Sequence, residues 1–259
     1  MKHLQRKIRN YRLKMVAITF WILLWQLLSM LIDNKIFLAS PMQVMRSLYR
    51  LGVTKDFWFT ILNSWIKIGS GFFLAIFVGN FLAIITCRFK TMKEITVVGM
   101  QLIKSIPVAS FIILALFWIR AKNLSILISF LMVLPMIYST VLRGIEEADV
   151  KLLEMAKVFR IKNRKKIRYI YLPSIIPYFV TGCSVSLGFC WKSGIAAEVI
   201  GLSENSIGIR LYEAKLYLNI EELFAWTFVI VCVSAVFEKL IMYLIHKISN
   251  QITKAKREA

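Results

Sequence analysis

The sequence has few acidic residues and little charge of any kind. Only 14 of its 259 residues are aspartate or glutamate, and charged residues make up 19% of the chain, below the ~25% usual for soluble proteins. Apolar residues make up 58%, and the mean hydropathy is +0.67. A soluble domain of this length has too large a surface to bury so much apolar material, and a disordered chain would be poor in it. Both classes are excluded, which leaves a membrane protein with several spans.

The motifs of common catalytic and metal sites are also missing. None of the four cysteines belongs to a CxxC pair or has a histidine near enough to suggest zinc. The sequence has no phosphate-binding loop of the Gly-x-x-x-x-Gly-Lys-Ser/Thr type, no HExxH and no GxSxG. We therefore expect a chain that is not an enzyme and does not bind ATP itself. The cysteines are expected to be small apolar side chains within the bilayer.

Apolar runs of the length that a bilayer requires, about 20 residues for a ~30 Å core, are present. The six predicted spans are 15–32, 60–86, 95–119, 123–142, 173–191 and 223–246. The first follows a basic N-terminus but is long for a signal peptide, so we interpret it as an uncleaved span. Pro107 and Pro135 fall inside the third and fourth spans, where neighbouring groups can satisfy the freed backbone carbonyls.

The distribution of Lys and Arg predicts the orientation. With a cytoplasmic N-terminus, 22 of the 34 basic residues lie in cytoplasmic segments and 9 in external ones, as the positive-inside rule requires. Both termini are therefore expected in the cytoplasm. We expect three parts: 1–58 with the first span and an external helix, a transmembrane core over 59–246, and a basic cytoplasmic tail over 247–259.

An external amphipathic helix is predicted after the first span. Ser40 and Pro41 are typical of a helix start, with a capping hydroxyl before a proline. The apolar stripe is Val44, Met45, Leu48 and Leu51, and it lies opposite Gln43, Arg46 and Arg50. Such a helix is expected to lie on the outer membrane face.

Two spans carry small residues at four-residue spacing, which lets another helix approach closely. The stripes are Gly71, Ala75, Gly79 and Ala83 in the second span, and Gly182, Ser186, Cys190 and Gly194 in the fifth. Two interpretations stay open: packing within the subunit, or a subunit interface or moving surface.

Lys104 lies near the middle of the third span, beside Ser105 and Pro107. A lysine at mid-bilayer costs about 2.5–3.5 kcal/mol on insertion scales, so it should face a cavity or a partner. It either lines a polar pathway, or snorkels or pairs with carbonyls freed by the proline. Lys67, Glu238 and Lys239 are expected at the membrane interfaces.

The cytoplasmic segment 143–172 is too long for a simple connector. It predicts a short helix, a polar turn around Lys162–Arg164 and a second short helix, with an apolar ridge made of Leu152, Leu153, Ala156 and Phe159. A hairpin with such a ridge needs a cytoplasmic partner. The basic cluster over 160–168 is interpreted as anchoring and docking rather than as a nucleic-acid site.

This segment resembles the EAA loop of ABC importer permeases. Glu154, Ala156, Ile170, Leu172 and Pro173 match in register, whereas Met155 replaces an alanine and Arg160 replaces the glycine. Further stretches over about residues 15–246 resemble the permeases of the nitrate/sulfonate/taurine type: Phe37-Leu38-Ala39-Ser40-Pro41, Ser105-Ile106-Pro107-Val108-Ala109, Trp191-Lys192, Ala196-Ala197-Glu198 and Ser206-Ile207-Gly208.

The resemblance implies an all-α, MetI-like type I permease in the bacterial inner membrane. It implies a homodimer with two ATPase subunits, which bind ATP and Mg, and an external solute-binding protein. The residues implied in ATPase coupling are Glu154, Ala156, Phe159, Arg160, Ile170, Leu172 and Pro173. Those implied in the substrate pathway are Lys104, Ser105, Pro107, Trp191, Lys192 and Glu198.

Several alternatives remain at this point. The resemblance allows nitrate, alkanesulfonates, taurine or heterocyclic vitamin precursors as substrate. A stand-alone secondary transporter or channel is the second hypothesis, but it would need coupling residues in the spans, and no mid-span acid accompanies Lys104. A membrane enzyme is the third.

Overall fold

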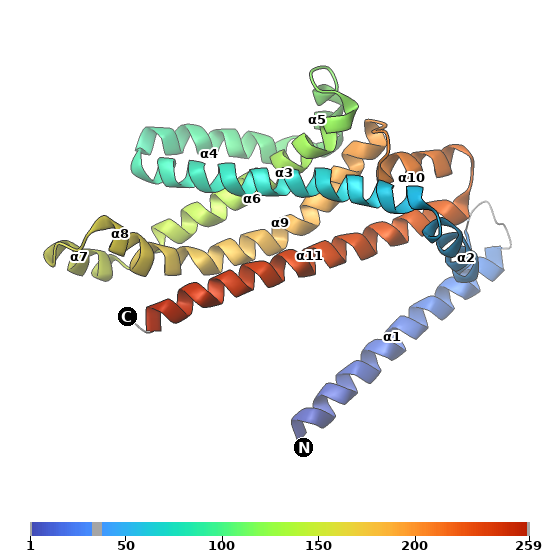
Figure 1. Ribbon diagram of the computed structural model, residues 1–259, viewed down its shortest axis with the longest axis horizontal. Helices are drawn as coiled ribbons and strands as arrows, with labels where there is room; N and C mark the ends of the chain where they lie inside the picture. The colour runs from blue at the N-terminus through green and yellow to red at the C-terminus, as the bar shows by residue number, and fades with distance from the viewer. Residues whose placement is uncertain (1, 33–37, 258–259) are drawn as a thin grey trace. The chain divides into compact units, whose positions relative to one another are not determined.

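The computed structural model describes the backbone of residues 2–32 and 38–257, and the side chains of 15–17, 19–31, 38–249 and 251. Within this range every regular element is helical, which confirms the all-α prediction (Figure 1). The elements are α1 (Lys2–Ile32), α2 (Pro41–Gly52), α3 (Lys55–Arg88), α4 (Lys90–Ser105), α5 (Val108–Ala115), α6 (Ala121–Glu146), α7 (Val150–Val158), α8 (Asn163–Lys166), the π-helical turn η1 (Ile167–Tyr171), α9 (Leu172–Ile200), α10 (Ile207–Leu216) and α11 (Ile220–Arg257). Phe37 and the side chains of the basic N-terminal residues 1–14 and of the tail residues 252–259 lie outside the described residues.

Four helical stretches are long and apolar enough to cross a membrane: Lys55–Arg88, Ala121–Glu146, Asn163–Ile200 and Ile220–Ser249. The pair α4 and α5 makes a fifth if it counts as one broken span. The first predicted span corresponds to a shorter apolar helix over Met15–Leu31. The structure therefore supports four to five spans by length and composition, and the sixth remains a prediction.

The third predicted span is not one continuous helix. The helices α4 and α5 are bent by 100° at Ile106 and Pro107, so the prediction of a single helix over 95–119 is wrong. Proline sterically disfavours the α conformation of the residue before it, and Ile106 has the extended angles φ −76° and ψ 128°. In contrast, α6 continues through Pro135.

The chain forms two compact units. The first contains residues 1–59 and 210–230, and the second contains 60–209 and 231–259. In the first unit α2 begins as predicted, because Ser40 Oγ accepts from the Gln43 amide at 3.3 Å and Gln43 Oε1 accepts from the Ser40 amide at 2.8 Å. Val44 packs with Ala39 and Ala225, and Leu48 and Leu51 lie against them. Met45 is 59% exposed, so it does not join these contacts, and the place of this helix on the outer membrane face stays a prediction.

Three helices of the second unit pack closely through their small residues. A Cβ at Gly71 of α3 would lie 2.5 Å from the Ile126 carbonyl oxygen of α6, and one at Gly182 of α9 would lie 2.3 Å from Thr140 Oγ1 of α6. Ala75 and Ser186 are fully buried in the same stripes, and Gly79 lies against Ile137. Both stripes therefore face helices of the same chain. Phe237 of α11 adds aromatic contacts with Trp65, Phe72 and Trp191.

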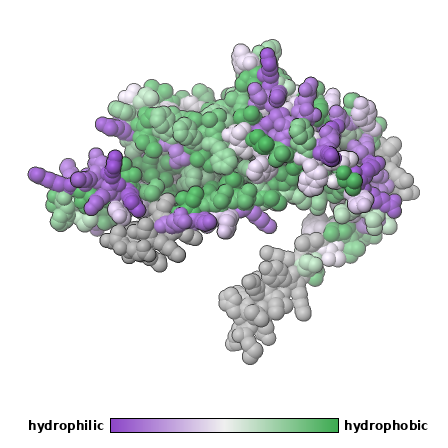
Figure 2. Space-filling view, viewed as in Figure 1, coloured by the Kyte–Doolittle hydropathy of each residue, from purple (hydrophilic) through white to green (hydrophobic). Residues whose placement is uncertain are grey.

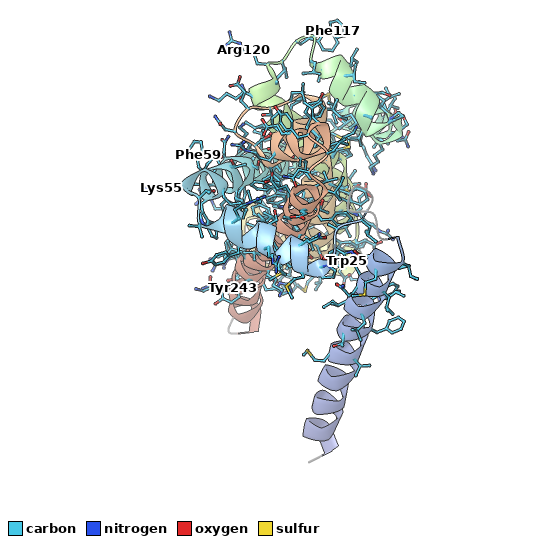
Figure 3. All side chains as sticks on the ribbon, turned by 90° about the vertical axis from the view of Figure 1, so that its right-hand side faces the viewer. Trp25, Lys55, Phe59, Phe117, Arg120 and Tyr243 are labelled. Atoms are coloured by element: carbon cyan, nitrogen blue, oxygen red, sulfur yellow. The ribbon has the colours of Figure 1, made fainter. Side chains whose placement is uncertain are left out.

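The surface of the second unit separates into apolar and charged regions. Figure 2 shows hydrophobic residues over the long helices and hydrophilic ones gathered over α7 and α8. Large apolar side chains such as Phe77, Phe81 and Ile84 of α3 are more than half exposed, as expected for a face in contact with lipid. Figure 3 shows Phe117 and Arg120 at the turn between α5 and α6, and Phe117 is 81% exposed.

Candidate functional site

The predicted cytoplasmic hairpin forms between α6 and α9. Asp149 caps α7 by accepting from the Lys151 amide at 2.9 Å. The chain then turns over residues 159–162, and α8 and η1 lead without a break into α9. A small core joins the two arms, in which Ala148, Ala156 and Ile170 are buried and Leu153, Ile161 and Tyr171 pack against them. The hairpin is therefore a packed element and not a loose loop.

The exposed apolar face of the hairpin differs from the predicted ridge. Ala156 is fully buried and Leu153 half-buried in the hairpin's own core, so these two residues do not form an outward ridge. The outward apolar residues are Val158, 77% exposed, and Phe159, 73% exposed, with Met155 beside them. The helical spacing was predicted correctly, but the inner face of α7 covers Ile170, which comes 14 residues after Ala156 in the chain.

Glu154 is exposed on α7 and makes no ion pair with any described residue. Lys151 and Lys157, at three-residue spacing on either side, were the local alternatives for its charge. Neither pairs with it in this structure. Its carboxylate is therefore available to a partner.

Arg160 occupies the turn where the EAA pattern has glycine. Its φ is +51°, a left-handed conformation that L-residues other than glycine and asparagine rarely adopt. The turn is a Schellman motif, because the Ile161 amide donates to the Ala156 carbonyl at 2.9 Å and the Arg160 amide to the Lys157 carbonyl at 3.1 Å. Arginine thus keeps the backbone geometry that glycine favours, at a cost in conformational energy.

We expect Arg160→Gly to stabilise the hairpin by about 1 kcal/mol, because glycine has no Cβ to clash in this conformation. Protection of the amides of residues 160 and 161 from hydrogen exchange measures the effect. Arg160→Ala is the matched control, since it removes the same side chain but keeps the Cβ. If both variants are equally stable, the left-handed conformation is not what limits the stability of this turn.

Ile170, Leu172 and Pro173 lie at the join between the hairpin and α9. Ile170 is 9% exposed, and Pro173 lies at the start of α9, directly after the π-helical turn η1. The helices η1 and α9 are continuous in the described chain, so no loop separates the hairpin from α9.

A second feature of the same unit is a polar cavity of about 620 Å³ between α4 and α6. Lys104, Gln101, Ser139 and Arg143 line it. Lys93 of α4 and Glu146 of α6 form an ion pair close by. Lys104 therefore faces a cavity, next to the break at Ser105 and Pro107.

The other predicted pathway residues lie elsewhere. Trp191 is 2% exposed and stacks edge-on with Phe237, while Lys192 is exposed. Glu198 is fully buried, and its Oε2 accepts from Ser64 Oγ at 2.8 Å and from the Gly208 amide at 3.2 Å. The structure does not bring these three residues to the Lys104 cavity.

Glu198 belongs to a buried polar cluster that sequence reasoning missed. Lys67 is only 6% exposed, and its Nζ donates to Ser203 Oγ at 3.3 Å, while its expected position at a membrane interface stays a prediction. The cluster ties α3 to the connection between α9 and α10. Ser64 and Glu198, and likewise Lys67 and Ser203, are more than 130 residues apart in the sequence, and no local pattern predicts these contacts.

Most of the chain matches a known protein family. The family described as binding-protein-dependent transport system inner membrane component matches residues 71–254, a range that holds α6, the hairpin and α9. The chain belongs to this family. It is the permease component of a binding-protein-dependent ABC importer of the inner membrane, and ATP is bound by a separate ATPase subunit. The alternatives of a stand-alone transporter and a membrane enzyme are thereby set aside.

Three relatives illustrate this permease's similarity to known proteins. It is 23% identical to the putative aliphatic sulfonates transport permease SsuC of Bacillus subtilis, over 88% of this chain and 83% of the relative. It is 24% identical to the nitrate import permease NrtB of Synechocystis, over 88% and 86%. It is 22% identical to the taurine transport system permease TauC of Escherichia coli, over 86% and 82%.

Proposed function

We propose that this permease imports a small anion by alternating access, as a homodimer driven by two ATPase subunits and supplied by an external solute-binding protein. The observation that carries the proposal is the packed cytoplasmic hairpin, which exposes Val158 and Phe159 and continues directly into α9. The substrate class rests on the relatives, whose names include sulfonates, nitrate and taurine.

The proposed topology has six spans and cytoplasmic termini. Met15–Leu31 is the first span, and α4 with α5 is one broken span, which brings the four long helices to six. The excess of Lys and Arg in the cytoplasmic segments supports this orientation. The hairpin then lies in the cytoplasm, and α2 and α10 lie outside.

The proposed coupling passes through the hairpin. Val158 and Phe159 bury their apolar surface in a cleft of the ATPase, at about 25 cal/mol per Å², and Glu154 orients the contact. Closure of the ATPases on ATP displaces the hairpin, and α9 moves with it. Because α9 packs on α6 through Gly182, the two helices move together against their neighbours, as expected of a rigid-body transition.

The proposed pathway includes the Lys104 cavity. Its ammonium group supplies the positive charge that attracts an anion, and Gln101 and Ser139 line the same cavity. Glu146 and Glu147 also line it, and their negative charge disfavours tight binding, as a transport site requires. Ser105 and Pro107 contribute by ending α4 at this point. For Trp191, Lys192 and Glu198 we propose no direct contact with substrate.

Lys104→Gln is expected to lower the uptake rate of an anionic substrate about tenfold, because a cation in a partly dehydrated cavity contributes about 1.4 kcal/mol or more. The measurement is uptake of radiolabelled nitrate or taurine by proteoliposomes that hold the whole transporter. Lys90→Gln, at the exposed start of the same helix, is the matched control. Equal uptake by wild type and Lys104→Gln would show that Lys104 is not part of the pathway.

A further inference from the structure

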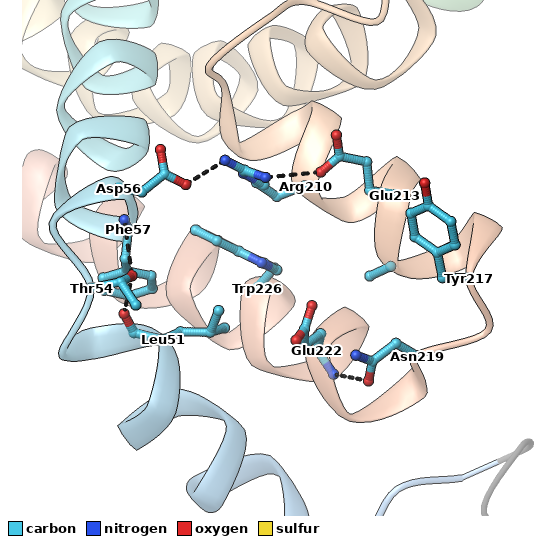
Figure 4. A pocket seen from close by; sticks show the side chains of 11 residues that line it. Leu51, Thr54, Asp56, Phe57, Arg210, Glu213, Tyr217, Asn219, Glu222 and Trp226 are labelled. Atoms are coloured by element: carbon cyan, nitrogen blue, oxygen red, sulfur yellow. Dashed lines mark hydrogen bonds and ion pairs between the residues drawn. The ribbon is translucent and has the colours of Figure 1, made fainter.

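The first unit contains a cavity of about 360 Å³ that the transport mechanism does not use. Figure 4 shows it bounded by the end of α2, the start of α3, α10 and the first turns of α11. All of its lining residues come from 51–57 and 210–226. In the proposed topology nearly all of these residues are external. Its volume is at the small end of the ~300–1,000 Å³ typical of ligand pockets, a size suited to one side chain.

Acidic residues outnumber basic ones in the lining of this cavity. Asp56, Glu213 and Glu222 face a single lining cation, Arg210. Arg210 binds Asp56 and donates to Glu213 Oε2 at 3.1 Å, and Arg50 donates to Glu222 Oε1 at 2.8 Å. Each carboxylate is thus engaged through one oxygen, while the second oxygen has no partner among the described residues. The cavity retains capacity to accept hydrogen bonds from a further cation.

An indole in the lining of the cavity supplies a hydrogen-bond donor that no described residue uses. Trp226 is 2% exposed, and Figure 4 shows it with Arg210 and Glu213 on one side and Glu222 on the other. Its Nε1–H has no acceptor among the described residues, and the nitrogen is not fully closed to solvent, so this donor is open to the cavity. Phe57 lies beside it, with ring centroids 5.1 Å apart.

We propose that this cavity receives a lysine or arginine side chain of the external solute-binding protein. The ammonium or guanidinium group binds the free oxygens of Glu213 and Glu222, through charge-assisted hydrogen bonds. A carbonyl group of the incoming loop accepts from Trp226 Nε1. The inference rests on the proposed function, because only that orientation places the cavity on the side of the binding protein.

The test is the affinity of the purified, ligand-loaded binding protein of the same transport system for the complete permease–ATPase complex in nanodiscs. The double variant Glu213→Gln/Glu222→Gln keeps the size of both side chains and removes their charge. We expect its dissociation constant to rise about 5- to 30-fold, with a weaker dependence on salt than wild type. Trp226→Phe keeps an aromatic ring beside Phe57 and removes the N–H, and about a threefold loss is expected.

Glu221→Gln is the matched control, because Glu221 precedes Glu222 in α11 and does not line the cavity. It removes one negative charge, half of what the double variant removes, and should alter the dissociation constant less than about twofold. Hexalysine peptide serves as a second probe. It should compete with the binding protein for the wild-type complex and compete much less for the double variant.

The outcomes separate this inference from the proposed function. If wild type binds the binding protein and the double variant binds it equally well, the cavity is not the docking site, although the permease function stands. A loss of the same size in Glu221→Gln would also overturn the inference, because it would indicate a diffuse charge effect. If wild type does not bind the binding protein or does not hydrolyse ATP with its ATPases, the proposed function itself fails.

Discussion

Glu154→Ala is expected to lower ATP-driven uptake at least about tenfold, while the permease still folds and inserts in the membrane. Glu154 is exposed, makes no ion pair in the described chain and lies on the same short helix as the apolar residues Met155 and Val158. A charge-assisted hydrogen bond to the ATPase contributes about 1.5–3 kcal/mol, whereas a local pair with Lys151 or Lys157 would contribute a few tenths. The size of the effect therefore distinguishes the two roles.

The measurements for this variant are uptake in proteoliposomes, ATP hydrolysis stimulated by the binding protein, and the yield of ATPase that co-purifies. Lys151→Ala is the matched control, since it removes an exposed charge from the same helix and should leave all three values near those of wild type. Glu154→Gln tests whether charge or only a hydrogen-bond acceptor is needed. Wild-type values for Glu154→Ala in all three assays would mean that the hairpin docks without this carboxylate.

Gly71→Ala is expected to destabilise the permease by about 1–3 kcal/mol or more, although alanine is the better helix former. Its Cβ would lie 2.5 Å from the Ile126 carbonyl oxygen and 2.9 Å from Ser129 Cβ. A backbone oxygen has no rotamer by which to move away, so α3 and α6 would have to separate. The loss of close packing along these helices then exceeds the gain in helix propensity.

Gly69→Ala provides the control for Gly71→Ala two residues earlier on the same helix. A Cβ there would meet only the Phe237 ring at 3.4 Å, which is ordinary van der Waals contact. Thermal unfolding in detergent, followed by the loss of monodisperse protein, should show a lower midpoint for Gly71→Ala and an unchanged or higher one for Gly69→Ala. Equal midpoints would indicate that α3 and α6 are not in close contact in the folded protein.

Local signals predicted those parts of the fold that local chemistry determines. Ser40 and Gln43 are three residues apart and form the predicted helix start, and the apolar lengths of α3, α6 and α9 predicted three of the long helices. Pro107 was read as a tolerated proline, but its steric effect on Ile106 ends α4 and produces the bend. The helix α10 was missed because the segment 192–222 was read as an external loop.

The site was predicted less completely because its geometry depends on distant residues. The hairpin was placed correctly, but Ala156 turned out to cover Ile170 and not to face a partner. Lys67 and Glu198 are charged residues that sequence alone places at interfaces or in a pathway, yet both are buried with serines from other segments. The Arg160 turn keeps its left-handed backbone without the glycine, because the Schellman hydrogen bonds fix the conformation.

The most direct test of the account is whether the hairpin touches the ATPase. Phe159 is 73% exposed on the hairpin, and Phe117 is 81% exposed at the turn between α5 and α6, which the proposed topology places outside. The variants Phe159→p-benzoylphenylalanine and Phe117→p-benzoylphenylalanine carry the same photoreactive group. On irradiation of membranes that hold the complete transporter, the first should cross-link to the ATPase subunit and the second should not. No cross-link from position 159, or an equal one from position 117, would contradict coupling through this hairpin.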